Sequence, residues 1–207
     1  MPSYRLLVTL FIVIIALVLT IVLKEQKSRR FVLVAMIFGM IGDYFMTSQF
    51  GNWKVVIGGI AFAIEHAIFI AMFIILFKEQ KLKIFNRWFI LSLAIFVVSL
   101  IIFEVLTFTL VQQPNVALAC LLPIYMLVIS VNMGFNFSYS FQRKGTFYFF
   151  ALGIFTFYVS DIFVFLGITK VTQPLSNIVW LFYPIGQLLM VLFCDKLEKN
   201  NTKQSDF

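Results

Sequence analysis

The chain has 207 residues and a formal net charge of +7; 62% of its residues are hydrophobic and 12% are charged. Apolar stretches of about twenty residues recur from end to end, which is typical of a helical membrane protein with several spans and leaves no room for a soluble domain. The positive charge does not indicate a nucleic-acid partner, because the basic residues fall in short segments between the apolar stretches rather than on one face of a domain.

Seven of these stretches are long enough to cross a bilayer as α-helices. They cover residues 6–23, 31–46, 54–77, 88–110, 116–133, 147–166 and 174–194. The first is too long for the core of a signal peptide and lacks a small-residue cleavage pattern after it, so we expect a retained helix. The predicted fold class is all-α: residues 1–195 form one domain, a bundle of seven transmembrane helices, and residues 196–207 form a polar cytoplasmic tail.

The basic residues between the stretches predict the orientation of the bundle. Thirteen of the 16 lysines and arginines follow the first, third, fifth and seventh stretches, whereas Arg5, Lys54 and Lys170 lie on the opposite side. The positive-inside rule then predicts a multi-pass protein of the cell membrane with its N-terminus outside and its C-terminus in the cytoplasm. An even number of spans would destroy this asymmetry.

The second and sixth stretches each carry one aspartate in an apolar setting: Asp43 follows Gly42, and Asp161 follows Ser160. A carboxyl group in hydrocarbon costs about 2.5–3.5 kcal/mol on insertion scales, so a functional role is the default interpretation. Gly39 and Gly42 allow a neighbouring helix to come close and hold Asp43 inside the bundle. The alternative is a structural carboxyl that bonds hydroxyl groups across helices.

Two pairs of stretches resemble each other and predict an internal repeat. In the second and third, and again in the sixth and seventh, the first helix supplies an aspartate and the second supplies an aromatic residue four positions before a polar one. These pairs are Phe62 with His66 and Tyr183 with Gln187, and residues four apart share a helix face. Both hairpins run in the same direction, which predicts a parallel repeat about the membrane normal.

Helix rise places the polar side chains at similar depth, at about 1.5 Å per residue. We expect six of them to line one pocket near the bilayer midplane: Asp43, His66, Tyr125, Asp161, Tyr183 and Gln187. Glu65 is as deep as His66, but adjacent helix positions diverge by about 100°, so the two cannot both face one pocket centre. Glu65 and Glu104 are therefore interpreted as structural or interfacial residues.

The remaining patterns speak against other kinds of site. The chain has one histidine and two cysteines, without paired spacing, so no metal is expected. Cys120 and Cys194 lie near opposite membrane faces, which makes a disulfide between them unexpected. The seventh stretch has no lysine before Lys196, so a retinal protein with a Schiff base is excluded.

At these residues the chain resembles the YhhN family of integral membrane proteins, whose animal members include lysoplasmalogenase. The resemblance covers roughly residues 31 to 195 and rests on an ordered combination of short motifs. These are Gly42-Asp43, Gly59-x-x-Phe62-x-x-x-His66-x-x-Phe69, Tyr125, Phe157-x-x-Ser160-Asp161 and Tyr183-x-x-Gly186-Gln187. This resemblance implies hydrolysis of the vinyl-ether bond of lysoplasmalogens to a fatty aldehyde and a glycerophospho-head group, without a metal or organic cofactor.

The chemistry of a vinyl ether fits two buried carboxyl groups. The bond is stable to base and cleaves when its β-carbon is protonated, so the enzyme needs a neutral acid and an anion that stabilises the oxocarbenium ion. Two neighbouring carboxyls divide these roles, as in glycosidases, and the sequence does not say which aspartate is the acid. The predicted catalytic residues are Asp43, Asp161 and His66, and the predicted substrate-binding residues are Tyr125, Ser160, Tyr183 and Gln187.

The expected partners are a lysophospholipid-like substrate, the lipid bilayer and a second copy of the chain in a homodimer. The competing interpretation is a non-catalytic protein that binds or transports a lipid or solute, in which the midplane carboxylates carry protons or bind a cation. Release of aldehyde from lysoplasmalogen by the purified protein separates the two interpretations.

Overall fold

The computed structural model describes residues 3–24, 26–47, 53–110, 116–143, 147–168 and 176–194. Over these residues the chain is all-α, without strands, and its seven helices confirm the predicted number. They are α1 (Ser3–Val22), α2 (Lys27–Thr47), α3 (Trp53–Glu79), α4 (Arg87–Leu110), α5 (Val116–Arg143), α6 (Phe147–Ile168) and α7 (Ser176–Phe193). The side chains of Glu104 and Cys120 and the predicted tail lie outside the described residues.

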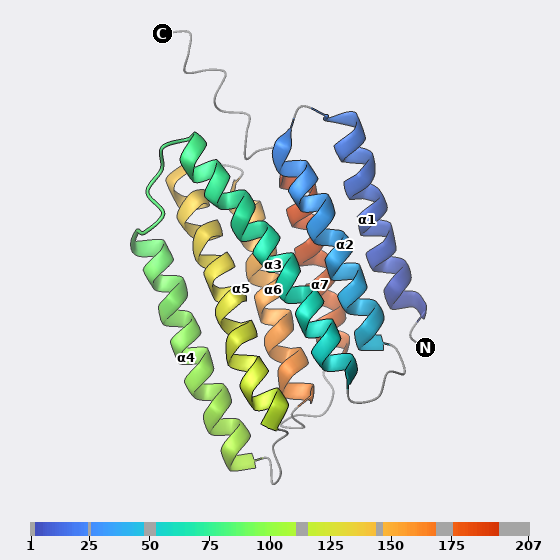
Figure 1. Ribbon diagram of the computed structural model, residues 1–207, viewed down its shortest axis with the longest axis vertical. Coiled ribbons are helices and arrows are strands. Elements are labelled where there is room, and N and C mark those ends of the chain that lie inside the picture. The colour runs from blue at the N-terminus through green and yellow to red at the C-terminus, as the bar shows by residue number, and fades with distance from the viewer. Residues whose placement is uncertain are drawn as a thin grey trace.

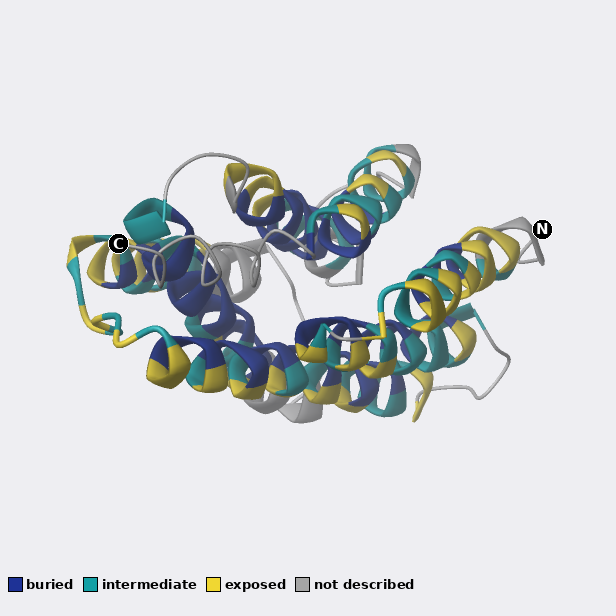
Figure 2. Ribbon diagram, turned by 90° about the horizontal axis from the view of Figure 1, so that it is seen from above, coloured by how far each residue is buried: buried dark blue, intermediate teal, exposed yellow. Residues whose placement is uncertain are grey.

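Six of the helices form a closed ring. Each contacts the next in the order α1, α2, α3, α5, α6, α7, and α7 returns to α1. Helix α4 lies outside this ring against α5, at the left edge of Figure 1. Figure 2 shows that buried segments face the inside of the bundle and exposed segments face outward. The bundle interior therefore belongs to helices from both halves of the chain.

Six helices begin and end within four residues of the predicted stretches, but α5 continues ten residues beyond the predicted end at Met133. Polar side chains in this extension form hydrogen bonds with the segment that joins α3 to α4. The Ser138 hydroxyl donates to the Ile84 carbonyl at 2.7 Å, and the Gln142 amide donates to the Lys83 carbonyl at 2.8 Å. The prediction stopped too early because the apolar character ends at Met133, whereas tertiary hydrogen bonds support the helix further.

The segment between α3 and α4 ends one helix and starts the next through local hydrogen bonds. Lys81 adopts a left-handed conformation (φ 52°), and the Leu82 amide donates to the Phe77 carbonyl at 3.1 Å, which is the pattern of a Schellman motif. The Asn86 side chain then accepts from the amides of Trp88 and Phe89 at 3.0 and 3.2 Å. Asn86 thereby caps α4 and satisfies two of its free amides.

Glycines set the closest approaches between helices. A Cβ atom on Gly186 of α7 would lie 2.8 Å from the Gly153 carbonyl oxygen of α6, so these two backbones are in direct contact. In α2, a Cβ on Gly42 would lie 2.7 Å from the Phe62 ring of α3. Gly42 thus admits a side chain of the neighbouring helix, and the α2–α3 and α6–α7 hairpins both pack through small residues.

Two helices, α2 and α3, are long and apolar enough to span a membrane, and four others carry shorter apolar segments within the described residues. Large apolar side chains also cover the outside of the bundle, among them Phe11 on α1 (62% exposed) and Ile101 on α4 (57%). These features support membrane association. A bundle in which all seven helices span the bilayer stays a prediction.

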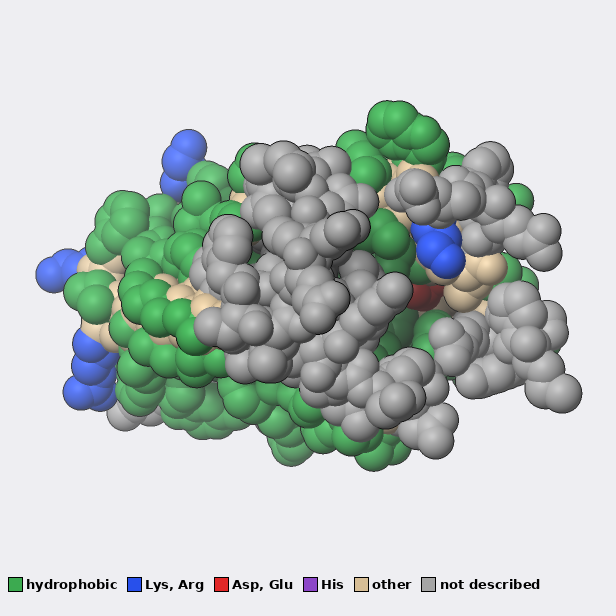
Figure 3. Space-filling view, turned by 90° about the horizontal axis from the view of Figure 1, so that it is seen from below, with side chains coloured by type: hydrophobic (Ala, Val, Ile, Leu, Met, Phe, Trp, Pro, Cys, Tyr) green, Lys and Arg blue, Asp and Glu red, His purple; other side chains and the backbone are tan. Residues whose placement is uncertain are grey.

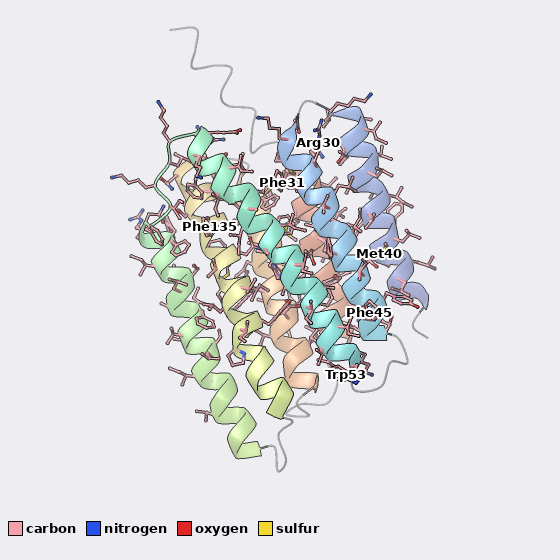
Figure 4. The ribbon with its side chains drawn as sticks, in the orientation of Figure 1. Arg30, Phe31, Met40, Phe45, Trp53 and Phe135 are labelled. Atoms are coloured by element: carbon pink, nitrogen blue, oxygen red, sulfur yellow. The ribbon has the colours of Figure 1, made fainter. Side chains whose placement is uncertain are left out.

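Because successive helices alternate in direction, the basic residues between them lie mostly at one end of the bundle. Helices α1, α3, α5 and α7 end there, and α2, α4 and α6 begin there, at the top of Figure 1. Apart from Lys54, the lysines and arginines whose side chains the structure describes lie at or beside these helix ends, and we call this the basic end. Figure 4 shows Arg30 at the basic end and Trp53 at the opposite end.

Candidate active site

One half of the candidate site lies between α3, α5 and α6. The Tyr125 hydroxyl of α5 donates to the Asp161 carboxylate of α6 at 2.5 Å, and Asp161 is 6% exposed. His66 of α3 is fully buried, with Nε2 3.5 Å from the Tyr125 hydroxyl and Nδ1 3.0 Å from the Asn132 amide nitrogen. An amide nitrogen can only donate, so Nδ1 accepts and the ring proton is on Nε2, facing Tyr125.

The other half lies between α2, α3 and α7 and has the same design. The Tyr183 hydroxyl of α7 is hydrogen-bonded to the Asp43 carboxylate of α2, which is 5% exposed. The Gln187 amide, one turn further along α7, donates to the Tyr183 oxygen at 2.8 Å. Phe62 of α3 packs edge-on against the Tyr183 ring, with centroids 6.2 Å apart. Each aspartate is thus held by a tyrosine from a neighbouring helix.

Aromatic packing joins the two halves. The Phe157 ring of α6 lies 5.0 Å from both the His66 ring and the Tyr183 ring, measured between centroids. Helix α3 passes between the halves and supplies a polar side chain to each of them. The structure therefore brings together the six side chains predicted to share a pocket: Asp43, His66, Tyr125, Asp161, Tyr183 and Gln187.

Glu65 belongs to this site, although its position next to His66 had suggested a separate role. It is fully buried, and its electrostatic neighbours are Asp43 and Asp161. Its Oε2 atom and the Gln187 Nε2 atom lie 2.7 and 3.0 Å from the point that a Cβ on Gly39 would occupy. The side chains of Glu65 and His66 diverge, as expected for adjacent helix positions. Both nevertheless lie inside the bundle, because one half of the site is on each side of α3.

Ser160 and Asn132 also differ from the sequence-based expectation. Ser160 is buried, and its hydroxyl donates to the Val179 carbonyl of α7 at 3.5 Å, away from the tyrosine that bonds the neighbouring Asp161. Asn132, which had not been predicted as a site residue, orients His66. Its position seven residues after Tyr125, on the same face of α5, was the available signal.

The site lies nearer the end opposite the basic end. Asp43 is four residues before the end of α2, about 6 Å along the helix, whereas Glu65 is about 18 Å from the start of α3. Viewed from this end, a small acidic area shows beside a basic side chain and next to apolar side chains (Figure 3). Among the described residues, no three His, Cys, Asp or Glu side chains are grouped closely enough to hold a metal ion. The carboxyl groups of Asp43, Glu65 and Asp161 therefore lie in the same interior but are not close enough together to bind one ion.

The described residues thus form a helical bundle that buries two tyrosine–aspartate pairs beside one histidine. The model of the YhhN family matches residues 4–193, which is nearly the whole chain. The chain therefore belongs to the YhhN family. Neither the curated proteins nor the solved structures that were compared with it include a significant match.

Proposed function

We propose that the protein is a membrane-embedded ether hydrolase of the lysoplasmalogenase type, which cleaves the vinyl-ether bond of lysoplasmalogens to a fatty aldehyde and a glycerophospho-head group. The observation that carries this proposal is the pair of buried aspartates, each hydrogen-bonded by a tyrosine. Family membership is consistent with it. Vinyl-ether cleavage needs an acid and an anion in one water-poor site, which two such carboxyls supply.

The proposed reaction has two stages. One aspartic acid gives its proton to the β-carbon of the vinyl ether, and the other aspartate stabilises the positive charge that develops on the neighbouring carbon and oxygen. Water then adds to this oxocarbenium ion and returns a proton to the site, and the hemiacetal collapses to aldehyde and alcohol. His66 positions this water, since its Nε2 proton faces the Tyr125–Asp161 pair.

The remaining side chains of the site suit substrate binding. Tyr125, Tyr183 and Gln187 fix the two carboxyls, and the aromatic rings between them offer an apolar surface to the alkenyl chain. Ser160 supports the α6–α7 contact beside the site. No cofactor has a role in this mechanism, because proton transfer and water addition complete it.

The proposed setting is the cell membrane, with the basic end in the cytoplasm. The apolar exterior and the positive charge at one end support seven spans with the N-terminus outside. The lysophospholipid would then reach the carboxyls from the outer part of the bilayer, because the site lies nearer the end opposite the basic end.

The direct test supplies purified protein in detergent with lysoplasmalogen and measures aldehyde. The matched control substrate is the lysophospholipid with a saturated alkyl ether. This ether lacks the double bond, so its β-carbon cannot accept a proton. We expect aldehyde from the vinyl ether alone. Tight binding of both lipids without aldehyde would contradict the proposal and favour lipid binding or transport by the same carboxyls.

A further inference from the structure

Helix α5 carries a row of buried polar side chains between the candidate site and the basic end. Asn132, Asn136 and Ser140 are fully buried and follow one another at intervals of four residues, so they lie along one face of the helix. A buried polar atom costs free energy unless it is hydrogen-bonded. Each of these side chains is therefore expected to have partners inside the bundle.

The structure shows the bonds at the two ends of this row. The Asn132 amide donates to His66 Nδ1 at 3.0 Å, and the Ser140 hydroxyl donates to Asn136 Oδ1 at 3.3 Å. Between these bonds, Asn132 Oδ1 and Asn136 Nδ2 are buried and have no partner among the described residues. The first of these atoms can only accept a hydrogen bond and the second can only donate one, so the two are complementary.

A water molecule is the ligand that suits these two atoms. Side chains one turn apart have Cβ atoms about 5–6 Å apart, a spacing that one molecule with two hydrogen bonds can span. The ligand must accept from one side chain and donate to the other, which excludes a metal cation and a simple anion. Water does both, and buried waters typically bind polar groups that otherwise lack a partner.

We propose that Asn132 and Asn136 bind one buried water molecule between their side chains. With this water in place, the hydrogen bonds from Asn136 onward all point in one direction. Asn136 donates to the water, the water donates to Asn132, and Asn132 donates to His66. The Nε2 atom of His66 then faces the Tyr125 oxygen at 3.5 Å, and the Tyr125 hydroxyl donates to Asp161 at 2.5 Å.

The water determines which way the Asn132 amide faces. The oxygen and nitrogen of an amide exchange places when the group turns over. A water that donates to Oδ1 keeps the nitrogen toward His66, so Nδ1 accepts and Nε2 keeps the ring proton. Asn136 is therefore a positioning residue. Its effect on turnover rests on the proposed function, because there the Nε2 proton positions the attacking water.

The histidine ring reports its tautomer directly by NMR, which distinguishes a ring nitrogen that carries a proton from one that does not. The chain has a single histidine, so protein made with isotopically labelled histidine, and purified without a histidine tag, gives the signals of His66 alone. At neutral pH we expect a bare Nδ1 and a protonated Nε2 in the parent. Asn136→Leu keeps the size of the side chain but cannot bind the water, and it should show both tautomers.

Ser130→Ala is the matched control. Ser130 lies on the same helix, is fully buried and has a hydroxyl without a partner among the described residues, but it is on another face of α5. Its spectrum should equal that of the parent, whereas Asn132→Leu should change the spectrum. An Asn136→Leu protein that keeps the single tautomer of the parent would overturn the inference, and so would a parent whose Nδ1 carries the proton.

A second measurement detects the water without any substitution. A water held between two side chains stays long enough to transfer magnetisation to a nearby amide. We expect transfer from water to the side-chain amide hydrogens of Asn136 in the folded parent. Its absence there would overturn the inference.

Kinetics with lysoplasmalogen test the link to the proposed reaction. Asn136→Leu should lower kcat roughly 3- to 10-fold, the scale of one net hydrogen bond, and leave KM nearly unchanged. Ser130→Ala should change neither constant. Parental kcat in an Asn136→Leu protein with mixed tautomers would overturn the positioning role. Absence of turnover in the parent would contradict the proposed hydrolase, whereas the water site is decided by the spectra alone.

Discussion

Asp161 receives a hydrogen bond from Tyr125, whereas the hydroxyl of Tyr158, one turn earlier on α6, has no partner within the described residues. Both tyrosines are buried, at 8% and 2% exposure. The two tyrosines are alike in burial and differ in whether the hydroxyl is hydrogen-bonded, so Tyr158 serves as the control for Tyr125. Removing the first leaves a buried carboxylate without its donor, and removing the second takes away an unsatisfied polar atom.

We therefore predict that Tyr125→Phe lowers kcat about tenfold and destabilises the protein by about 1–3 kcal/mol, the usual cost of leaving a buried polar group without its partner. Tyr158→Phe should leave kcat unchanged and stability equal or higher. Aldehyde release and thermal unfolding in the same detergent measure both effects. Equal losses of kcat and stability in the two variants would mean that the hydrogen bond from Tyr125 to Asp161 contributes nothing specific.

Asp43→Asn and Asp161→Asn are each expected to remove turnover and leave a folded protein. Asparagine keeps the shape and accepts a hydrogen bond, but it can neither donate an acidic proton nor carry the stabilising charge. Loss of a general acid typically costs about 100- to 10,000-fold in rate. His66→Ala should cost less if it positions water. Substantial activity in either asparagine variant would favour the binding or transport interpretation.

Sequence reasoning found most of this site because rare polar residues in apolar stretches identify themselves. Asp43, Asp161 and His66 were singled out in this way, and the structure brings them to one interior. It did not place Glu65 in this interior, because a single pocket centre was assumed where two halves lie on either side of α3. The division follows from which helices become neighbours, and local sequence does not contain that information.

At the scale of helices, the glycines of α6 and α7 make the closest contacts with the backbone of a neighbouring helix. A Cβ on Gly153 would lie 2.9 Å from the Gly186 carbonyl, and one on Gly186 would lie 3.0 Å from the Phe157 amide nitrogen. Backbone atoms cannot move aside as a side chain can. Gly59 of α3 provides the contrast, since nothing lies within 4 Å of its added Cβ.

We predict that Gly186→Ala destabilises the protein by about 1–3 kcal/mol, the usual cost of overpacking, and lowers activity because α7 carries Tyr183 and Gln187. Gly59→Ala should be neutral or stabilising by up to about 1 kcal/mol, because alanine favours a helix over glycine. Thermal unfolding of both variants in detergent tests this. A stable, active Gly186→Ala protein would show that the two helices separate more easily than their contact implies.

Helix boundaries were predictable where the chemistry of the chain changes and not where tertiary contacts decide. The apolar stretches gave most helices, because their ends coincide with charged or turn-forming residues. Helix α5 was the exception, since Ser138 and Gln142 bond the segment before α4 and carry the helix to Arg143. The parallel repeat of the two hairpins stays a prediction, supported by their shared packing through glycines.

For the whole molecule, the order of helices in the ring was beyond the sequence. Helix α3 packs against α5, and its sequence neighbour α4 also packs against α5 but lies outside the ring. The segment between α3 and α4 is long enough to allow either arrangement. The ring nevertheless determines the site, because α3 can supply Glu65 to one half and His66 to the other only when it lies between α2 and α5.

The orientation of the molecule gives a prediction at the same scale. Thirteen basic residues follow the first, third, fifth and seventh predicted stretches and three lie on the other side in the sequence, which predicts that the basic end is cytoplasmic. A reporter fused after Phe207 should read as cytoplasmic, and one placed before Met1 as external. The opposite reading at either terminus would refute the predicted topology.

The central claim, acid-catalysed hydrolysis of a vinyl ether inside the bundle, is tested most directly by running the reaction in heavy water. Protonation of the β-carbon places one solvent hydrogen on the carbon next to the aldehyde, and mass spectrometry detects it after the aldehyde is trapped by immediate reduction. The prediction is aldehyde with a single deuterium at that carbon, and none of this product from Asp43→Asn. Aldehyde without deuterium, or no aldehyde from the parent protein, would contradict the claim.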